Sequence, residues 1–232
     1  MTDQKILIIG SGFAAAANLI HLVEAGVKPS QITIVGPGQL GRGNAYGCDD
    51  DDFRLNVRAN LMWIWPDRRD DFGNWAKTHI TDDKDAMRRS GMFYRRRDFG
   101  RYVASRVDAV LAGAGDQDHA ITHYPQIVTK LGKIDQGGWQ AECSDGRLIR
   151  ADLVLLATGN PPPQWPCPIH GEMAQLPKLE NRLVQNPWNG QWLDHLPAQS
   201  RLAIIGGGLT ALDAITALAR RNHQGSVFLL AP

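Results

Sequence analysis

The sequence predicts an α/β protein that has one complete unit with a parallel sheet and the start of a second unit. Three observations support this fold class. A strand, a glycine-rich turn, a helix and another strand follow one another between Lys5 and Val35. The same order returns 196 residues later, from Ile204 to Leu230. Three β-type segments joined by hairpin turns lie between the two. Strands that alternate with helices are typical of a parallel sheet.

The first unit follows from local patterns. Lys5–Ile9 is a short apolar run that ends at Gly10, as expected of a buried parallel strand. The alanine-rich segment Phe13–Ala25 predicts a helix that stops at the next glycine. Ile32–Val35 predicts the second strand. Residues 36–65 are rich in Gly, Asp and Asn and are expected to form a loop.

The middle of the chain predicts one helix and an antiparallel meander. Asp98 is a candidate N-cap for a helix over Phe99–Leu111. Gly137-Gly138 and Asp145-Gly146 have the composition of hairpin turns. The predicted strands, of which the second to fourth form the meander, are Ala120–Tyr124, Ile127–Ile134, Trp139–Cys143, Arg147–Ile149 and Leu153–Ala157.

A proline-rich stretch beginning at Pro161-Pro162-Pro163 indicates a stiff linker. We therefore expect a first domain over residues 1–160, a Pro/Trp-rich linker over 161–200 and the start of a second unit over 201–232. That unit has a helix at Ala211–Arg221 and a strand at Val227–Leu230, but no further strands. The sequence thus looks like the N-terminal portion of a longer protein.

Composition is that of an ordinary soluble globular protein. The 232 residues carry a net charge of +1, so nucleic acid is not a favoured partner. The runs Arg95–Arg97 and Asp49–Asp52 are interpreted as solvated faces. No run of 18 apolar residues occurs, so no membrane span is expected. A small-molecule substrate is the expected partner, and the oligomeric state is left open.

Metal and disulfide chemistry are not expected. The three cysteines, Cys48, Cys143 and Cys167, are widely spaced and form no C-x-x-C, which fits a reducing cytoplasm. His119 and His123 are four residues apart, as helical metal ligands would be. The segment between them has the pattern of a strand, so no metal site is predicted.

Both glycine turns have the pattern G-x-G-x-x-A. In the first copy, Gly10 permits the tight turn, Gly12 lets the backbone approach a pyrophosphate, and Ala15 lets the helix pack closely on the strand. The amides at the start of the helix then face the phosphates. Gly206, Gly208 and Ala211 take these places in the second copy. The alternative is a turn without a ligand.

A third glycine follows the last predicted strand of the first unit, in the stretch LVLLATGNPPP. Thr158 and Gly159 are expected at the carboxyl end of the sheet, where open α/β folds bind ligands. Gly159 would permit the close approach of a ribose or phosphate. A simple strand-to-linker turn is the alternative.

Seven stretches together resemble the bacterial FAD/NAD(P)-binding proteins with two dinucleotide-binding domains, which are similar in architecture to flavin monooxygenases. They are IIGSGFAA, LGRGNAYG, FRLNV, RRRDFGRY, LLATGNPPP, NPWNG and IIGGGLTALDA. The resemblance implies a Rossmann-like FAD-binding domain with a parallel sheet and an antiparallel β-meander, followed by the start of a second Rossmann-like NAD(P)-binding unit.

The resemblance also implies which residues bind the cofactors FAD and NAD(P)H. Those expected at the FAD pyrophosphate are Gly10, Ser11, Gly12, Phe13, Ala14 and Ala15. Those expected along the flavin side are Gly41, Arg42, Gly43 and Asn56. Those expected to face NAD(P)H are Gly206, Gly208, Leu209, Thr210 and Ala211. No catalytic side chain is identified, because the cofactor carries the difficult chemistry in flavin enzymes.

Gly36 departs from the pattern, because an acidic residue usually stands there and binds the ribose hydroxyls. Two explanations are open. Either FAD binds without that hydrogen bond, about tenfold or more weaker, or the glycine serves a backbone conformation that a side chain would resist. A second departure is Trp63-Ile64-Trp65, where smaller residues are usual and where either indole is a candidate neighbour of the flavin ring.

The expected function is an FAD-dependent oxidoreductase that uses NAD(P)H to reduce the flavin, with a hydroxylating monooxygenase as its most specific form. A non-catalytic sensor or scaffold module that binds the same nucleotides is the rival. Completeness of the second unit separates the two, because such an enzyme needs a closed second unit and a substrate region. The substrate and the choice between NADH and NADPH are left open.

Overall fold

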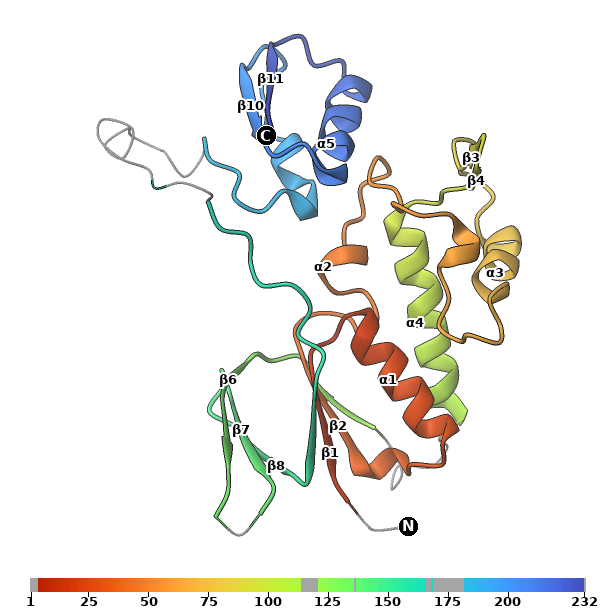
Figure 1. Cartoon of the computed structure of the whole chain (residues 1–232), viewed down its shortest axis with the longest axis vertical. Helices are drawn as coiled ribbons and strands as arrows, with labels where there is room; N and C mark the ends of the chain where they lie inside the picture. Colours follow the sequence, from red (N-terminus) through yellow and green to blue (C-terminus); the bar gives the residue numbers. More distant parts are fainter. Residues whose placement is uncertain (1–3, 114–120, 136, 166–167, 169–181, 232) are drawn as a thin grey trace.

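The computed structural model describes residues 4–113, 121–135, 137–165, 168 and 182–231. Its centre is a parallel sheet in the order β5-β2-β1-β9, formed by Thr122–Tyr124, Ile32–Val35, Ile6–Ile9 and Leu153–Leu156. Ile6 pairs with Ile32 on one side and with Leu153 on the other. The parallel sheet of the predicted fold class is therefore confirmed (Figure 1).

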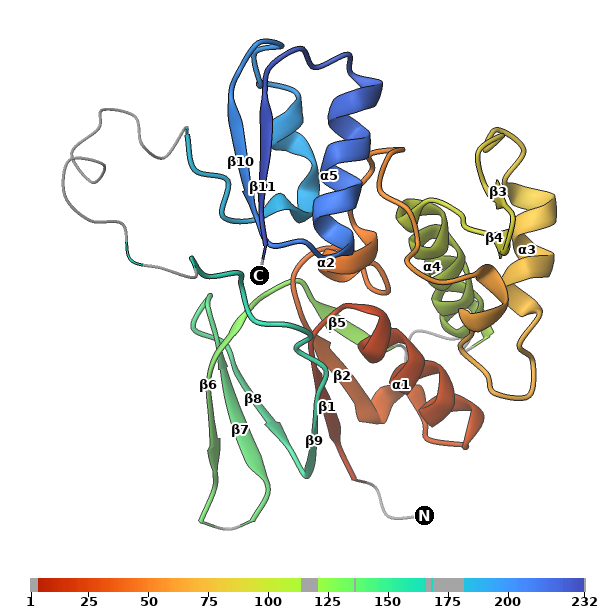
Figure 2. The same ribbon diagram turned by 45° about the horizontal axis from the view of Figure 1, so that its top comes forward.

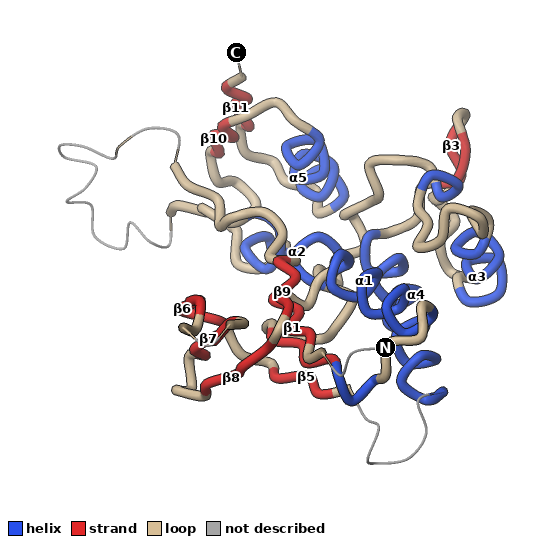
Figure 3. Tube along the Cα trace, turned by 60° about the horizontal axis from the view of Figure 1, so that its bottom comes forward, coloured by secondary structure: helices blue, strands red, loops and turns tan. Residues whose placement is uncertain are grey.

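Helices cover one face of this sheet and the meander covers the other (Figures 1 and 3). Side chains alternate along β1, so Ile8 faces α1 (Phe13–Glu24) and α4 (Arg96–Gly113), while Leu7 faces the meander. The meander consists of β6 (Val128–Lys133), β7 (Trp139–Cys143) and β8 (Leu148–Ala151), paired antiparallel as predicted. The position of the sheet between two layers explains why its central strand β1 is apolar and buried throughout.

The segment predicted as a loop contains short elements, and the residues after it contain a helix that the sequence analysis does not predict. The bounds are α2 (Gly43–Tyr46), η2 (Ala59–Leu61), α3 (Asp71–His79), β3 (Met87–Arg88) and β4 (Gly91–Met92), while η1 (Pro29–Gln31) precedes β2. Phe72 of α3 packs against Phe99 of α4 with ring centres 5.0 Å apart. Tertiary packing rather than local pattern therefore defines this helix.

The long helix α4 begins at Arg96, two residues before the predicted cap. Asp98 is therefore a residue of the first turn, fully buried, and not the N-cap. Burial raises the pKa of the Asp98 carboxyl, while Arg95, Arg97 and Arg101 oppose that rise. The prediction was wrong because a local cap pattern does not show that Arg96 and Arg97 already belong to the helix.

The C-terminal part repeats the strand–turn–helix–strand unit. Strand β10 (Leu202–Ile205) pairs in parallel with β11 (Val227–Leu230), and α5 (Leu209–Arg220) connects them. The short helices η6 (Pro187–Asn189) and η7 (Gln191–Leu193) precede this unit. Figure 2 shows α5 beside α2, on the opposite side of α2 from the main sheet. No described helix is long and apolar enough to cross a membrane.

Candidate functional site

The first glycine turn lies at the carboxyl end of β1, where the backbone allows no side chain at Gly10. Its φ is +124°, and a Cβ built there would lie 2.1 Å from the carbonyl oxygen of Ala157. The Gly10 amide donates to the Val35 carbonyl at 2.7 Å. The end of β1 is thus held between the ends of β2 and β9, as the glycine pattern predicts.

The start of α1 forms a narrow backbone cradle. Gly12 is its N-cap in an extended conformation, and no described side chain caps the helix. A Cβ on Gly12 would meet only Gly43 Cα, at 3.7 Å, whereas a Cβ on Gly43 would lie 2.8 Å from Gly12 Cα. Ala15 is fully buried against the sheet. The first-turn amides therefore face a space bordered by backbone, which suits a pyrophosphate.

Gly36 has no room for a side chain. Its Cβ would lie 2.5 Å from both Gly10 C and Ser11 N. The Gly36 amide donates to the Tyr124 carbonyl at 3.1 Å, and its own carbonyl lies 3.0 Å from His123 Nε2. The close approach of the Gly10–Ser11 backbone therefore excludes a side chain at Gly36, which is a steric reason for the missing acid. The positive φ expected in this loop is found at Gly38, not at Gly36.

The loop after Gly36 wraps around the first turn. Ser11 donates its hydroxyl to the Pro37 carbonyl, and the Gly41 amide donates to the Ser11 carbonyl at 2.8 Å. The structure thus brings Gly41 and Gly43 to the turn. Arg42 pairs with the exposed carboxylate of Asp49. These contacts join two stretches that the sequence analysis assigned separately to pyrophosphate and flavin.

Asn56 lies in another environment. Its Oδ1 accepts a hydrogen bond of 3.0 Å from Arg96. Thr158 and Gly159 follow β9 and are both exposed, and the Thr158 amide would lie 3.3 Å from a Cβ on Gly10. Gly159 has a φ of +69° and open space around it. These two residues are therefore beside the first turn, on its solvent side.

The second glycine turn repeats the first turn closely. The Gly206 amide donates to the Leu230 carbonyl at 2.8 Å, the counterpart of the bond between Gly10 and Val35. Gly206 has a φ of +106°, and Gly208 caps α5 in the same extended conformation as Gly12. Ala211 is buried.

The second turn is more open than the first. A Cβ at Gly206 or Gly208 would meet no described atom within 4 Å. The four residues of β11 are exposed. Among the described residues, β10 and β11 form a two-stranded sheet of their own.

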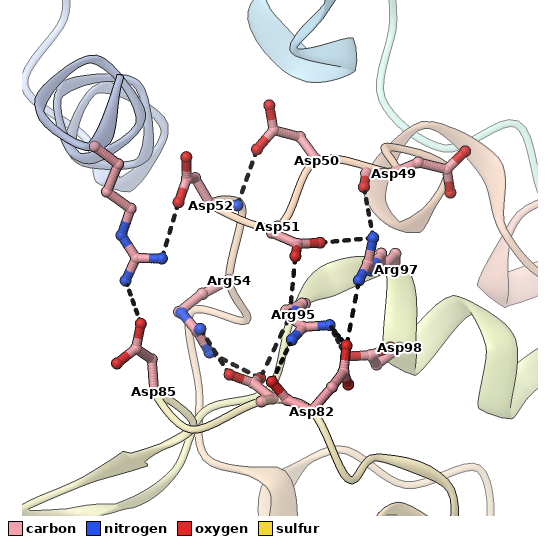
Figure 4. A network of polar contacts seen from close by, with 12 residues as sticks. Asp49, Asp50, Asp51, Asp52, Arg54, Asp82, Asp85, Arg95, Arg97 and Asp98 are labelled. Carbon is pink, nitrogen blue, oxygen red and sulfur yellow. Dashed lines mark hydrogen bonds and ion pairs between the residues drawn. The ribbon is translucent and has the colours of Figure 1, made fainter. Parts of the chain in front are cut away.

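The charged runs are only partly solvated, whereas the sequence interpretation made both of them solvated faces. Arg95 and Arg96 are buried, at 5% and 6% exposure. Figure 4 shows the acidic run beside the arginine run, with Asp51 between Arg95 and Arg97. Asp52 is also buried. The prediction was wrong for these buried side chains because Arg95 and Arg96 pair with carboxylates from elsewhere in the fold, Asp83 and Asp213. Asp49 and Asp51 remain exposed.

The two parts of the chain that carry the glycine turns meet through this charged region. Arg96 pairs with Asp213 of α5 at 2.8 Å. Burial raises the pKa of the Asp213 carboxyl, and the charge and hydrogen bond of Arg96 oppose that rise. An apolar cluster backs the contact, and it combines Cys48 and Phe53 with Leu193 and Leu218. Sequence analysis missed this contact because 117 residues separate the paired side chains.

An open cavity of about 800 Å³ lies beside the same contact. Its walls are the acidic run, the segment around Trp188 and the end of α5, including Arg220 and Arg221. It therefore lies at the end of α5 opposite the Gly206 turn.

Trp65, one of the two candidate tryptophans, lies away from the first glycine turn. Trp65 donates its indole N–H to Glu24 at 2.7 Å, at the last turn of α1. That position is about 16 Å along the helix from the glycine turn, so Trp65 is not the expected neighbour of the flavin ring. His119 lies outside the described residues, and no group of three or more metal-ligating side chains occurs within them.

Comparison with known proteins adds a family and a set of similar folds. Residues 7–161 match the sequence model of the family described as FAD-NAD(P)-binding. This match confirms the cofactor class predicted from sequence, FAD and NAD(P). No curated protein matches the sequence.

Solved structures of monooxygenases share the fold. A cyclohexanone monooxygenase mutant from Rhodococcus sp. Phi1 bound to NADP+ has 18% identity and a TM-score of 0.62, over 97% of this chain and 38% of that one. OTEMO in complex with FAD and NADP has 15% identity and a TM-score of 0.59, over 98% of this chain and 38% of that one. This chain thus spans a little over a third of their length.

Proposed function

We propose that this chain, which belongs to the FAD-NAD(P)-binding family, is the nucleotide-binding part of a flavin-dependent oxidoreductase that draws its electrons from NAD(P)H. FAD binds at the first turn, Gly10–Ala15, within residues 1–160. NAD(P)H binds at the second turn, Gly206–Ala211, within residues 201–232. The residues between, 161–200, link the two units and lie partly outside the described residues.

One observation carries the proposal. Two turns in one chain have the same carbonyl–amide bond, the same extended cap and a buried alanine at the same position. Each such turn suits one dinucleotide pyrophosphate. The first is bordered by Gly43, and the second has open space around Gly208. A tightly held cofactor suits the enclosed turn, and a nucleotide that binds and leaves in every cycle suits the open one.

The residues of the chain bind and orient the nucleotides. When bound, the flavin would accept a hydride from the nicotinamide and pass electrons to oxygen or another acceptor. Gly12 admits the pyrophosphate because it carries no side chain, while Gly10 permits the tight turn at the end of β1. The start of α1 directs amides at the pyrophosphate. We propose a hydroxylating monooxygenase as the specific activity, which the shared fold with FAD- and NADP-bound monooxygenases supports.

A pair of matched variants tests the proposal. Gly12→Val places a side chain in the first cradle, and its Cβ makes only an ordinary contact, so the protein is expected to fold. Gly208→Val does the same at the second turn. We expect Gly12→Val to abolish FAD binding in a fluorescence titration, while Gly208→Val keeps FAD and slows its anaerobic reduction by NADPH at least tenfold.

Each variant is the control for the other. Equal FAD content in Gly12→Val and the parent would show that the first turn is not the FAD site. A parent protein that binds FAD and is never bleached by NADPH or NADH favours the non-catalytic module. Equal reduction rates in Gly208→Val and the parent would remove the second turn from the reaction.

A further inference from the structure

We propose that Arg96 is a positioning residue that fixes the second nucleotide unit against the first and so sets the spacing between the two glycine turns. The proposal rests on the proposed function for the ligands at those turns. The contacts on which it rests are all between residues of this chain and involve no bound nucleotide.

Arg96 connects three separate parts of the fold through one buried guanidinium. Its side chain is 8% exposed. Nε donates to the Arg54 carbonyl at 2.9 Å, and Nη2 donates to Asn56 Oδ1 at 3.0 Å and to Asp213 Oδ2 at 2.8 Å. Its guanidinium carbon also lies 5.7 Å from the ring centre of Trp188. A planar group with fixed donor directions holds several partners in one geometry, which a lysine cannot do.

Asp213 places this contact close to the second turn. It is the fifth residue of α5, so it lies about 6 Å along the helix axis from Leu209. Its side chain is 14% exposed. Because a helix transmits displacement as a rigid rod, holding Asp213 also holds the start of α5, where the nicotinamide nucleotide is proposed to bind.

A second set of ion pairs holds the far end of the same helix. Arg221 pairs with Asp50 at 2.6 Å and with Asp52 at 2.9 Å, and Arg220 reaches Asp85 at 2.8 Å. Two attachments along one helix restrict its rotation as well as its position. The outer arginines are 35–38% exposed, so salt screens their pairs. The buried Arg96 pair is therefore the attachment that fixes the geometry.

Paired variants and a distance measurement test the role. Arg96→Gln removes the positive charge of the pair. Asp213→Asn removes the negative charge but keeps the size of the side chain and one acceptor oxygen. Arg97→Gln is the matched control, because this neighbouring arginine pairs with Asp51 and Asp82 and does not reach α5. The parent and all variants are made in the full chain, which also carries Cys167→Ser so that this cysteine takes no spin label.

Spin labels then report the spacing of the two units. One label goes at Asp108→Cys, exposed on α4, and the other at Thr216→Cys, exposed on α5. Cys48 and Cys143 are buried and are expected to stay unlabelled. The distance distribution between the labels is measured by pulsed electron paramagnetic resonance without added nucleotide. FAD affinity and the rate of flavin reduction at saturating NADPH are measured in parallel on unlabelled protein.

We expect a single narrow distance distribution in the parent and in Arg97→Gln. Arg96→Gln and Asp213→Asn broaden it at least twofold, keep FAD affinity within about twofold and slow flavin reduction at least tenfold. The double variant Arg96→Gln/Asp213→Asn broadens the distribution and slows reduction no more than Arg96→Gln alone, because both changes remove the same Arg96–Asp213 pair.

Unchanged distributions in both variants would overturn the proposal, as would equal broadening in Arg97→Gln. Loss of the folded state in both variants would show that the pair holds the fold rather than the spacing, which also overturns it. A parent that binds FAD and is not reduced by NADPH refutes the proposed function instead. The distance distributions then decide the role of Arg96 independently.

Discussion

The absence of an acid at Gly36 leads to a sharp prediction about packing at the first turn. Gly36→Ala adds only a Cβ, which would stand 2.5 Å from the backbone atoms Gly10 C and Ser11 N. Ordinary van der Waals contact begins near 3.4 Å. The turn proposed to bind the pyrophosphate must therefore move by roughly 1 Å, because both clashing atoms belong to the backbone.

The size of the effect follows from this displacement. Overpacking a well-filled site costs about 1–3 kcal/mol. If that strain falls on the binding conformation, FAD affinity drops about 5- to 150-fold. Gly36→Glu carries the same strain, which opposes the roughly 1.5–3 kcal/mol that a charge-assisted hydrogen bond to the ribose contributes. The alanine variant is therefore the cleaner measurement, since it contains only the steric effect.

The assay is a fluorescence titration of FAD into the apoprotein, with circular dichroism to verify folding. Gly132→Ala serves as the control, because its Cβ meets no described atom within 4 Å and it lies in β6. We expect weaker binding in Gly36→Ala and parent-like binding in Gly132→Ala. Parent-like affinity in Gly36→Ala, or tighter binding in Gly36→Glu, would refute the packing explanation and restore the explanation based on the missing ribose contact.

Two further predictions concern stability. Burial raises the pKa of Asp71, but hydrogen bonds from Arg106 and Tyr102 outweigh it and leave the pKa lowered. The ionised form thus stabilises the fold at neutral pH, and this contribution disappears as pH falls through the folded-state pKa. Asp71→Asn should lower the free energy of unfolding by about 1.5 kcal/mol at pH 7, whereas Asp67→Asn should behave like the parent. In urea titrations the difference should shrink as the pH falls below 3.8, the ordinary pKa of the group, and through the lowered folded-state pKa. Gly206→Ala, at a φ of +106°, should cost about 1 kcal/mol. A urea midpoint of Gly206→Ala equal to that of the parent would refute the predicted backbone strain at that turn.

The local patterns of the sequence were sufficient to predict the two glycine turns and the succession of strand, turn, helix and strand along the chain at each of them. Gly10 and Gly206 are required by conditions within a few residues: a positive φ, a strand before the turn and a helix after it. The meander was likewise predictable from its turn residues and alternating strands. Such signals are short-range, so a single sequence is enough to show them.

The buried charge pairing and the reason for Gly36 became visible only in the tertiary structure. Arg96 and Asp213 are 117 residues apart, and neither carries a local signal that distinguishes a buried ion pair from a solvated face. The reason for Gly36 is equally non-local, because the atoms that exclude its side chain belong to another strand's turn. Hydrophobic periodicity identifies which face of an element is buried, but the partner of a charge depends on the path of the whole chain, which brings distant residues within hydrogen-bonding distance only after folding.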